Sequence, residues 1–132
     1  MTAIAIIACG GRDFTDREFV FGALDRVARD RSAVTLINGG APGADTLAAE
    51  WARDFGYAVV TFKADWKLLG PQAGHIRNQV MLDALLKLRS SSQIIGVVAF
   101  PGGRGTADMK RRATAADVPV FEPIYKAATT VN

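Results

Sequence analysis

The residues of this chain best suited to chemistry form the segment Pro101-Gly102-Gly103-Arg104-Gly105-Thr106. Three glycines in four positions let the backbone turn sharply and present its N–H groups. An apolar run precedes the segment at residues 94–100, and residues 107–116 have the pattern of a helix. A helix N-terminus adds unpaired N–H donors and the positive end of the dipole, and Arg104 adds a cation. The combination predicts an anion-binding loop for phosphate. The alternative is a tight strand-to-helix turn without a ligand.

Within this segment we assign the phosphate contacts to backbone N–H groups and to one hydroxyl. These residues are Gly102, Gly103, Gly105 and Thr106, with Arg104 as the neighbouring cation. Thr106 has an alternative role as a simple N-cap of the following helix.

A second glycine-rich segment, Gly10-Gly11-Arg12-Asp13, follows the apolar run at residues 3–9. Its two glycines are candidate ligand contacts, and Arg12 is a candidate contact for an anion. Asp13 either joins this site or only holds the loop. Cys9, at the end of the run, is interpreted as a small core residue.

A third segment, Gly39-Gly40-Ala41-Pro42-Gly43-Ala44-Asp45, follows the run at residues 33–38. Gly40 and Gly43 form a second candidate cradle for a ligand. Asp45 has two interpretations, because its carboxylate either accepts hydrogen bonds from ribose hydroxyls or caps the next helix.

Arg77 and Asn78 lie at the start of a helix predicted at residues 76–89, where Ile76 and Val80 begin an apolar stripe at helical spacing. From this position Arg77 makes a bidentate contact to phosphate or is a surface arginine. Asn78 either contacts the base or ribose of a ligand or caps the helix. The two interpretations of each residue stay open at this point.

These residues need a scaffold in which strands and helices alternate. Strands are predicted at residues 3–9, 33–38, 57–62, 94–100 and 118–124. Helices are predicted between them, ending near residues 30, 55, 89 and 116. Continuous apolar runs indicate strands covered on both faces, so the pattern predicts an α/β fold with a parallel sheet of about five strands. Because ligands bind beyond the carboxyl ends of such strands, the glycine-rich segments converge on one rim.

Local signals predict where some elements begin and which strand lies at an edge. Thr15 and Glu18 fit a capping box at the start of the first helix, and Phe14 and Phe19 fit the accompanying hydrophobic staple. Pro119, near the start of the last strand, predicts an edge strand.

Other polar segments receive structural interpretations. A loop is predicted at residues 63–75, and His75 is interpreted as a loop residue rather than a base. Residues 90–92 are interpreted as a polar connector. Arg111 and Arg112 are interpreted as a solvated helix face.

The composition is that of an ordinary globular protein, with 132 residues, 49% hydrophobic and 22% charged, so we expect one domain over residues 1–132. No apolar run approaches the roughly 20 residues of a membrane span, and we expect neither a membrane segment nor a signal peptide. Cys9 is the single cysteine, which rules out an intrachain disulfide and favours the cytoplasm. Without a Cys/His cluster we expect no metal, and we expect no cofactor. The net charge of +3 suits an anionic ligand but is too small to indicate nucleic acid.

Together the motifs resemble those of the SLOG superfamily, in its small YspA-type branch, over nearly the whole chain. They are Gly10-Gly11-Arg12-Asp13-Phe14, the segment from Gly39 to Asp45, Arg77-Asn78 and the segment from Pro101 to Thr106. The resemblance implies a Rossmann-like three-layer α/β/α fold that binds a nucleotide or nucleotide-derived small molecule. It also favours the phosphate role of Arg77.

The resemblance extends to two kinds of relative with different activities. The LOG ("lonely guy") phosphoribohydrolases cleave the base from a nucleoside monophosphate at a dimer interface, so a homodimer is a further hypothesis. The DNA-processing protein DprA binds single-stranded DNA. Too few aromatic residues interleave with the basic ones here to favour nucleic acid.

One departure from the LOG pattern P-G-G-x-G-T-x-x-E concerns its catalytic glutamate, whose position here holds Met109. Asp108 is adjacent, but one helical residue turns a side chain by roughly 100°, which makes it a poor substitute. Asp13, Asp45 and Asp65 are the alternative carboxylates. We therefore expect a ligand sensor or binding module, with a LOG-like phosphoribohydrolase as the alternative and a DprA-like nucleic-acid binder as the second alternative.

Overall fold

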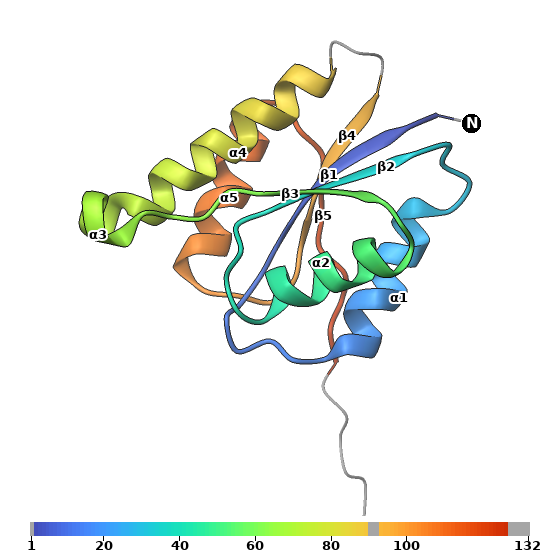
Figure 1. The fold of residues 1–132 in the computed structure, drawn as a ribbon, viewed down its shortest axis with the longest axis horizontal. Coiled ribbons are helices and arrows are strands. Elements are labelled where there is room, and N and C mark those ends of the chain that lie inside the picture. The colour runs from blue at the N-terminus through green and yellow to red at the C-terminus, as the bar shows by residue number, and fades with distance from the viewer. Residues whose placement is uncertain (1, 90–92, 127–132) are drawn as a thin grey trace, which may run out of the picture.

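A five-stranded parallel sheet forms the centre of the molecule (Figure 1). The computed structural model describes residues 2–89 and 93–126, so the predicted connector at residues 90–92 and the tail after residue 126 lie outside the described residues. The strands are β1 Ile4–Cys9, β2 Val34–Asn38, β3 Ala58–Thr61, β4 Ile94–Ala99 and β5 Val120–Phe121. They stand in the order β3-β2-β1-β4-β5 and all pair in parallel. The predicted α/β class with a five-stranded parallel sheet is confirmed.

The continuous apolar sequence of β1 places that strand in the middle of the sheet. All 6 of its residues are buried, and Ile4 is aligned with Val34 of β2 and with Ile94 of β4. β5 is one edge of the sheet, and its neighbour Pro119 accepts a hydrogen bond from the Val97 backbone N–H at 2.9 Å. Proline lacks an N–H to donate, which suits it to this edge, as predicted.

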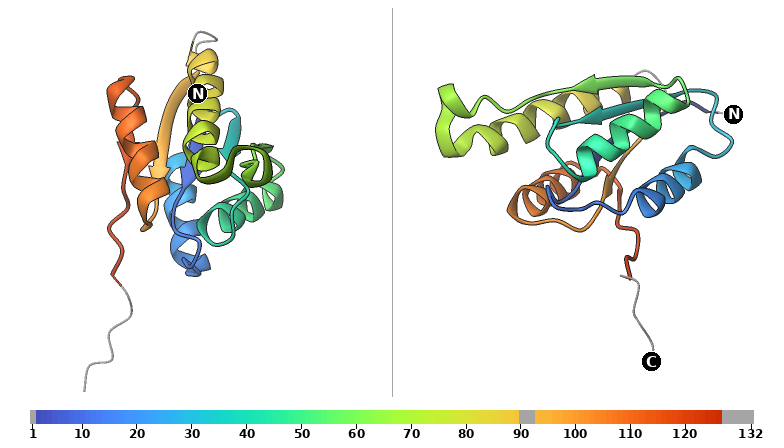
Figure 2. Two further views of the ribbon diagram at one scale, coloured as in Figure 1. Left: turned by 90° about the vertical axis from the view of Figure 1, so that its left-hand side faces the viewer. Right: turned by 60° about the horizontal axis from the view of Figure 1, so that its bottom comes forward.

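Helices cover both faces of the sheet and complete three layers (Figure 2). They are α1 Arg17–Ala28, α2 Ala44–Asp54, α3 Trp66–Leu69, α4 Ala73–Arg89 and α5 Arg104–Ala115, with a 3₁₀ helix, η1 Gly70–Gln72, before α4. Alternate residues of β1 serve two cores, since Ile6 packs with α1 and α2 and Ile7 packs with α4 and α5. Among the described residues, no helix combines the length and apolar character needed to cross a membrane.

The winding of the chain reverses between β1 and β4. From β1 the chain steps outward through β2 to β3, and it then crosses back along α4 to add β4 on the other side of β1. The loops that follow β1 and β4 therefore leave the sheet in opposite directions. In parallel sheets this point opens the crevice in which ligands bind.

The start of α1 differs from the predicted capping box. Asp16, not Thr15, is the N-cap, and its carboxylate accepts a hydrogen bond from the Phe19 backbone N–H at 3.0 Å. The helix begins one residue later than the box requires, so Glu18 is the second helical residue and cannot reach back to the cap. The rings of Phe14 and Phe19 still meet, with centroids 6.0 Å apart.

The predicted loop at residues 63–75 is wrong from residue 66 onward, because residues 66–75 are helical. Asp65 caps α3 by accepting a hydrogen bond from the Leu68 backbone N–H at 3.0 Å. α4 then begins before His75, which is a helical residue. The predicted apolar stripe is wrong at its start, because Ile76 and Val80 are exposed, whereas Leu85, a later residue of the same predicted stripe, is buried against the sheet. This part of α4 extends beyond the sheet together with α3 (Figure 2), so its outer face has no core to meet.

α5 begins earlier than the residues 107–116 predicted for it. Its N-cap is Gly103, and Arg104, Gly105 and Thr106 form the first helical turn. The alternative role of Thr106 as the N-cap is therefore wrong.

Candidate functional site

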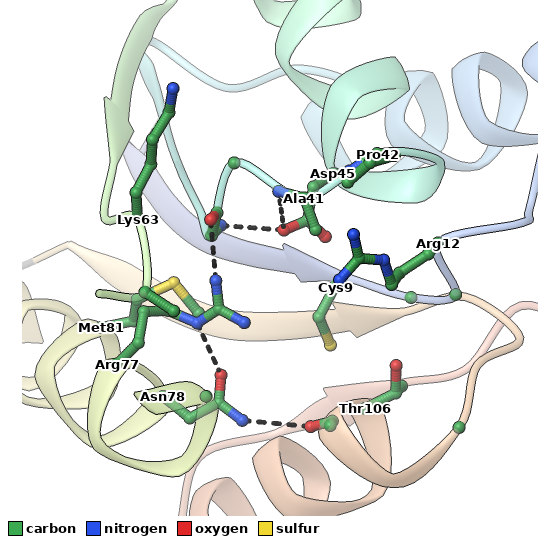
Figure 3. A pocket seen from close by; sticks show the side chains of 18 of the residues that line it. Cys9, Arg12, Ala41, Pro42, Asp45, Lys63, Arg77, Asn78, Met81 and Thr106 are labelled. Atoms are coloured by element: carbon green, nitrogen blue, oxygen red, sulfur yellow. Dashed lines mark hydrogen bonds between the residues drawn. The ribbon is translucent and has the colours of Figure 1, made fainter. Parts of the chain in front are cut away.

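A pocket of about 460 Å³ opens at the carboxyl ends of the strands, at the winding reversal. Its volume falls within the range of about 300–1,000 Å³ typical of small-molecule sites. Of the residues predicted for the site, those lining the pocket are Gly10, Gly11, Arg12, Gly40, Asp45, Arg77, Asn78, Gly103, Arg104, Gly105 and Thr106. Asp13, Gly43 and Gly102 do not line it. The structure thus brings together residues that are far apart in the sequence (Figure 3).

Basic side chains dominate the charge of this pocket. Arg12, Lys63, Arg77 and Arg104 line it, and Asp45 is the one carboxylate among the described lining residues. Figure 3 shows the Arg12 guanidinium directed toward the middle of the pocket. Such a lining attracts an anion.

The N-terminus of α5 reaches the pocket without a side-chain cap. The N-cap, Gly103, has no side chain, whereas Asp16 caps α1 and Asp65 caps α3 through their carboxylates. The first N–H groups of a helix have no partner within the helix, and they carry the positive end of its dipole. An anion in the pocket would satisfy these donors.

At two pocket positions, Gly103 and Gly105, the surrounding atoms leave room for a side chain. A Cβ atom added at either position would meet no atom within 4 Å, and neither residue has a positive φ. Both lie at the start of α5 and line the pocket. Their lack of side chains leaves the backbone of the α5 N-terminus open to a ligand.

The remaining glycines of these loops have structural reasons instead. A Cβ atom at Gly102 would collide with the Thr106 hydroxyl, and one at Gly10 would lie 2.6 Å from the Cβ of Ala44. Gly43 has a φ of +81° and lies against the Gly11 carbonyl. These close approaches join the three loops, so Gly43 and Gly102 support the pocket from behind rather than line it.

Asp45 holds the loop between β2 and α2. Its Oδ2 accepts hydrogen bonds from the backbone N–H of Gly39 at 3.0 Å and of Ala41 at 3.3 Å. The N-cap of α2 is Gly43, so the helix-cap interpretation of Asp45 is wrong. Burial raises the pKa of Asp45, against the lowering effect of these hydrogen bonds and of the Arg77 charge.

Arg77 is anchored within the pocket by its own chain. Its Nη1 donates to the Gly39 carbonyl at 2.7 Å, and its Nε donates to Oδ1 of Asn78 at 3.2 Å. The guanidinium is half-buried, so the interpretation of Arg77 as a plain surface arginine is wrong. Its position makes it a fixed positive charge in the wall of the pocket.

Asn78 joins α4 to α5. Its Nδ2 donates to the Gly105 carbonyl at 3.1 Å and to the Asp108 carboxylate at 3.0 Å. Because α4 begins at Ala73, Asn78 is not a helix cap. Its amide is committed to positioning the first turn of α5.

Asp108 is the centre of an ion-pair cluster behind this turn. It is 5% exposed and contacts His75, Arg111 and Arg112, with Nε of Arg112 at 2.8 Å. Burial alone would raise the pKa of Asp108, but hydrogen bonds from Arg112, Asn78 and His75 outweigh it and hold the pKa below its usual value. Arg112 also donates to Gln79 at 2.8 Å, so the solvated-face interpretation is wrong for Arg112.

Neither Met109 nor Asp108 lines the pocket. Met109 is fully buried in the core between α4, α5 and the sheet. Cys9 does line the pocket, but burial raises the pKa of its thiol to about 12, so the sulfur is neutral. Within residues 2–89 and 93–126, no cluster of His, Cys, Asp or Glu is arranged to hold a metal ion.

Several pocket residues were missed by the sequence prediction. They are Cys9, Gly39, Ala41, Pro42, Lys63, Ala64, Trp66, Gly74 and Met81. Lys63 and Trp66 had a usable signal, since they follow β3 and reach the same rim as the glycine-rich segments. Gly74 lies in the glycine-containing loop predicted after the third strand, whereas Met81 had no signal, because its place depends on how α4 crosses the sheet.

The fold and the position of the pocket define a Rossmann-like α/β protein. The model of the YspA, cpYpsA-related SLOG family matches residues 4–68. The chain is 35% identical over 124 residues to the Gene 61 protein of Mycobacterium phage D29, a match that covers 88% of this chain and 93% of the phage protein. The chain belongs to the YspA, cpYpsA-related SLOG family, which confirms the resemblance drawn from its motifs.

A solved structure supports the same fold. The X-ray structure of TM1055 is 21% identical and matches with a TM-score of 0.62, over 91% of this chain and 72% of that one.

Proposed function

We propose that the pocket binds a nucleotide or nucleotide-derived small molecule, with a phosphate against the N-terminus of α5. In this proposal the protein is a ligand sensor or binding module. The basic lining, the uncapped helix and the position at the winding reversal all favour a phosphate. Membership of the SLOG family agrees with a nucleotide-related ligand.

The observation that carries the proposal is the open space at Gly103 and Gly105. Gly103 is the N-cap, a position that tolerates glycine, but Gly105 is the second residue of α5, where glycine costs about 0.5–1 kcal/mol relative to alanine and needs a compensating reason. Neither close packing nor a positive φ provides one here. Access of a phosphate to the backbone N–H groups of Gly105 and Thr106 provides it.

A hydrolase of the LOG type is supported less well. Its reaction needs a carboxylate at the substrate, and Met109 occupies the matching position as a core residue. Asp45 is the carboxylate of the lining, but its Oδ2 already holds two backbone N–H groups. DprA-like binding of single-stranded DNA is also less well supported, since Trp66 is the one aromatic side chain among the described lining residues.

The proposal has two further parts, a homodimer and a cytoplasmic location. A homodimer is proposed from the resemblance to LOG enzymes, and the exposed apolar side chains of Ile76 and Val80 on α4 are where we would place the contact. A cytoplasmic location is proposed because one cysteine does not call for an oxidising compartment.

The test begins with a thermal-shift screen and native mass spectrometry against mononucleotides, NAD and ADP-ribose. The strongest ligand is then titrated by calorimetry into wild type and Gly103→Val. Because a Cβ at residue 103 meets open space, the variant should fold while its side chain enters the phosphate position. We expect at least tenfold weaker binding. Equal affinity of the two proteins would show that the phosphate lies elsewhere.

A further inference from the structure

One exposed aromatic side chain stands apart from the others at the pocket. Trp66 lines the pocket with 53% of its surface exposed. The second tryptophan, Trp51, is fully buried and donates through its indole N–H to Asp25 at 2.8 Å. Trp51 thus belongs to the core, while Trp66 offers a large apolar surface to the ligand space.

The position of Trp66 is fixed by the cap of its own helix and by a contact with α4. It is the first residue of α3, which Asp65 caps through the Leu68 backbone N–H. On α4, Gly74 leaves room for the indole, because a Cβ atom there would lie 3.3 Å from Cη2 of Trp66. Gly74 also lines the pocket, so one edge of the ring lies along its wall.

The order of the strands separates Trp66 from the α5 N-terminus. Trp66 follows β3, the loop from Gly39 follows β2, Arg12 follows β1, and Gly103 follows β4. These strands are neighbours in that order, so β3 and β4 are three strand spacings apart, or about 14 Å. A ligand that touches both Trp66 and the α5 N-terminus therefore extends from the β3 side of the pocket to its β4 side.

The lining changes in character along this direction. Near Trp66 it includes Ala64 and Gly74, which are apolar, together with Lys63, and near α5 it includes Arg104 and the first helix N–H groups. A nucleoside phosphate fits this arrangement, since its flat base and its charged phosphate are attached to opposite ends of the ribose.

We propose that Trp66 is the platform on which the base of the ligand stacks, and that the ligand therefore is a nucleoside phosphate rather than a sugar phosphate. This inference rests on the proposed phosphate site at α5. The ribose lies over the loop that Asp45 holds, between the two ends. Stacking on an aromatic ring accepts any base, so Trp66 contributes affinity more than choice among bases.

The test compares two kinds of probe, one with a base and one without it. Calorimetry measures the affinities of the four common nucleoside monophosphates and of ribose 5-phosphate for wild type, Trp66→Ala and Trp66→Phe. Leu68→Ala is the matched control, since Leu68 is on the same turn, is 77% exposed and does not line the pocket. Tryptophan fluorescence is recorded in the same titrations.

We expect the best mononucleotide to bind wild type at least tenfold more tightly than ribose 5-phosphate. Trp66→Ala should abolish this difference without weakening ribose 5-phosphate, while Trp66→Phe retains most of it and Leu68→Ala retains all. The mononucleotide should quench wild-type fluorescence and leave that of Trp66→Ala unchanged, because Trp51 is buried and does not line the pocket.

Other results overturn the inference, and they distinguish it from the proposed function. Equal binding of mononucleotides and ribose 5-phosphate, unaffected by Trp66→Ala, refutes stacking and leaves the phosphate site standing. An equal loss for both probes in Trp66→Ala makes Trp66 a support of α3 only. A change from dimer to monomer in sedimentation velocity, with unchanged mononucleotide affinity, makes it a subunit contact. Failure of all these probes to bind wild type rejects the inference, and the proposed function falls as well if NAD and ADP-ribose also fail to bind.

Discussion

The side-chain amide of Asn78 donates a hydrogen bond to the Asp108 carboxylate at 3.0 Å, and this contact links α4 to α5 directly behind the pocket. The same amide donates to the Gly105 carbonyl. The turn that presents backbone N–H groups to the pocket is therefore held from behind by a buried polar network. Polar residues predicted as ligand contacts thus include some that position the site.

The Asp108 cluster should make stability depend on pH at the acidic end. The pKa of Asp108 is lowered from the reference value of 3.8, so its contribution is complete above that pH and is lost as pH falls through the lower folded-state pKa. Asp108→Asn should lose about 1–3 kcal/mol at neutral pH, because charged hydrogen bonds to Arg112 and His75 are weakened. Urea unfolding at several pH values measures both effects.

The wild-type minus Asp108→Asn difference in unfolding free energy should shrink below about pH 4. Glu122→Gln is a control, since Glu122 pairs with Lys110 on an exposed surface. A difference that stays constant with pH would mean that folding does not lower the pKa of Asp108.

Asp45 should act on the loop at residues 39–41 rather than on a ligand hydroxyl. Asp45→Ala removes the acceptor of the Gly39 and Ala41 backbone N–H groups, at an expected cost of about 1–3 kcal/mol. Asp45→Asn keeps a carbonyl oxygen in the same place and should cost much less. Thermal unfolding of the two variants gives the comparison. A similar loss for both would contradict a role through this acceptor.

The sequence alone was sufficient for much of this architecture. Continuous apolar runs mark β1 and β4 because strands covered on both faces need no polar residues. Glycine-rich segments mark the rim because the loops after β1, β2 and β4 pack against one another, as at Gly10 and Gly102. These signals are local, so they can be recognised in the sequence without knowledge of the tertiary structure.

The predictions that were wrong concern residues whose role or burial depends on contacts with distant parts of the chain. Asn78 looks like a cap or a ligand contact until α5 supplies Gly105 and Asp108 as its partners. Ile76 and Val80 have helical spacing, but the part of α4 that carries them extends past the sheet, so they are exposed. For α1, Thr15 and Asp16 are both competent caps, and the sequence did not rank them.

Base release should be absent from the wild-type protein. No appreciable free base is expected from nucleoside monophosphates in a chromatographic assay, because Met109 cannot accept a proton or stabilise a cation. Met109→Glu restores the LOG pattern but places a carboxylate in the core, at a cost of about 2–7 kcal/mol, and should not create activity. Robust turnover by wild type would reject a binding module, and Asp45→Asn would then be the first variant to assay.

The central claim, that a phosphate meets the α5 backbone at Gly105, is tested most directly by pairing Gly105→Ala with Gly22→Ala. Both positions are helical and have room for a methyl group, but Gly22 lies in α1 and does not line the pocket. Alanine should stabilise both helices by up to about 1 kcal/mol, measured by urea unfolding. Calorimetry with the tightest-binding mononucleotide should show at least tenfold weaker binding for Gly105→Ala and wild-type affinity for Gly22→Ala. Wild-type affinity in both variants would contradict the account.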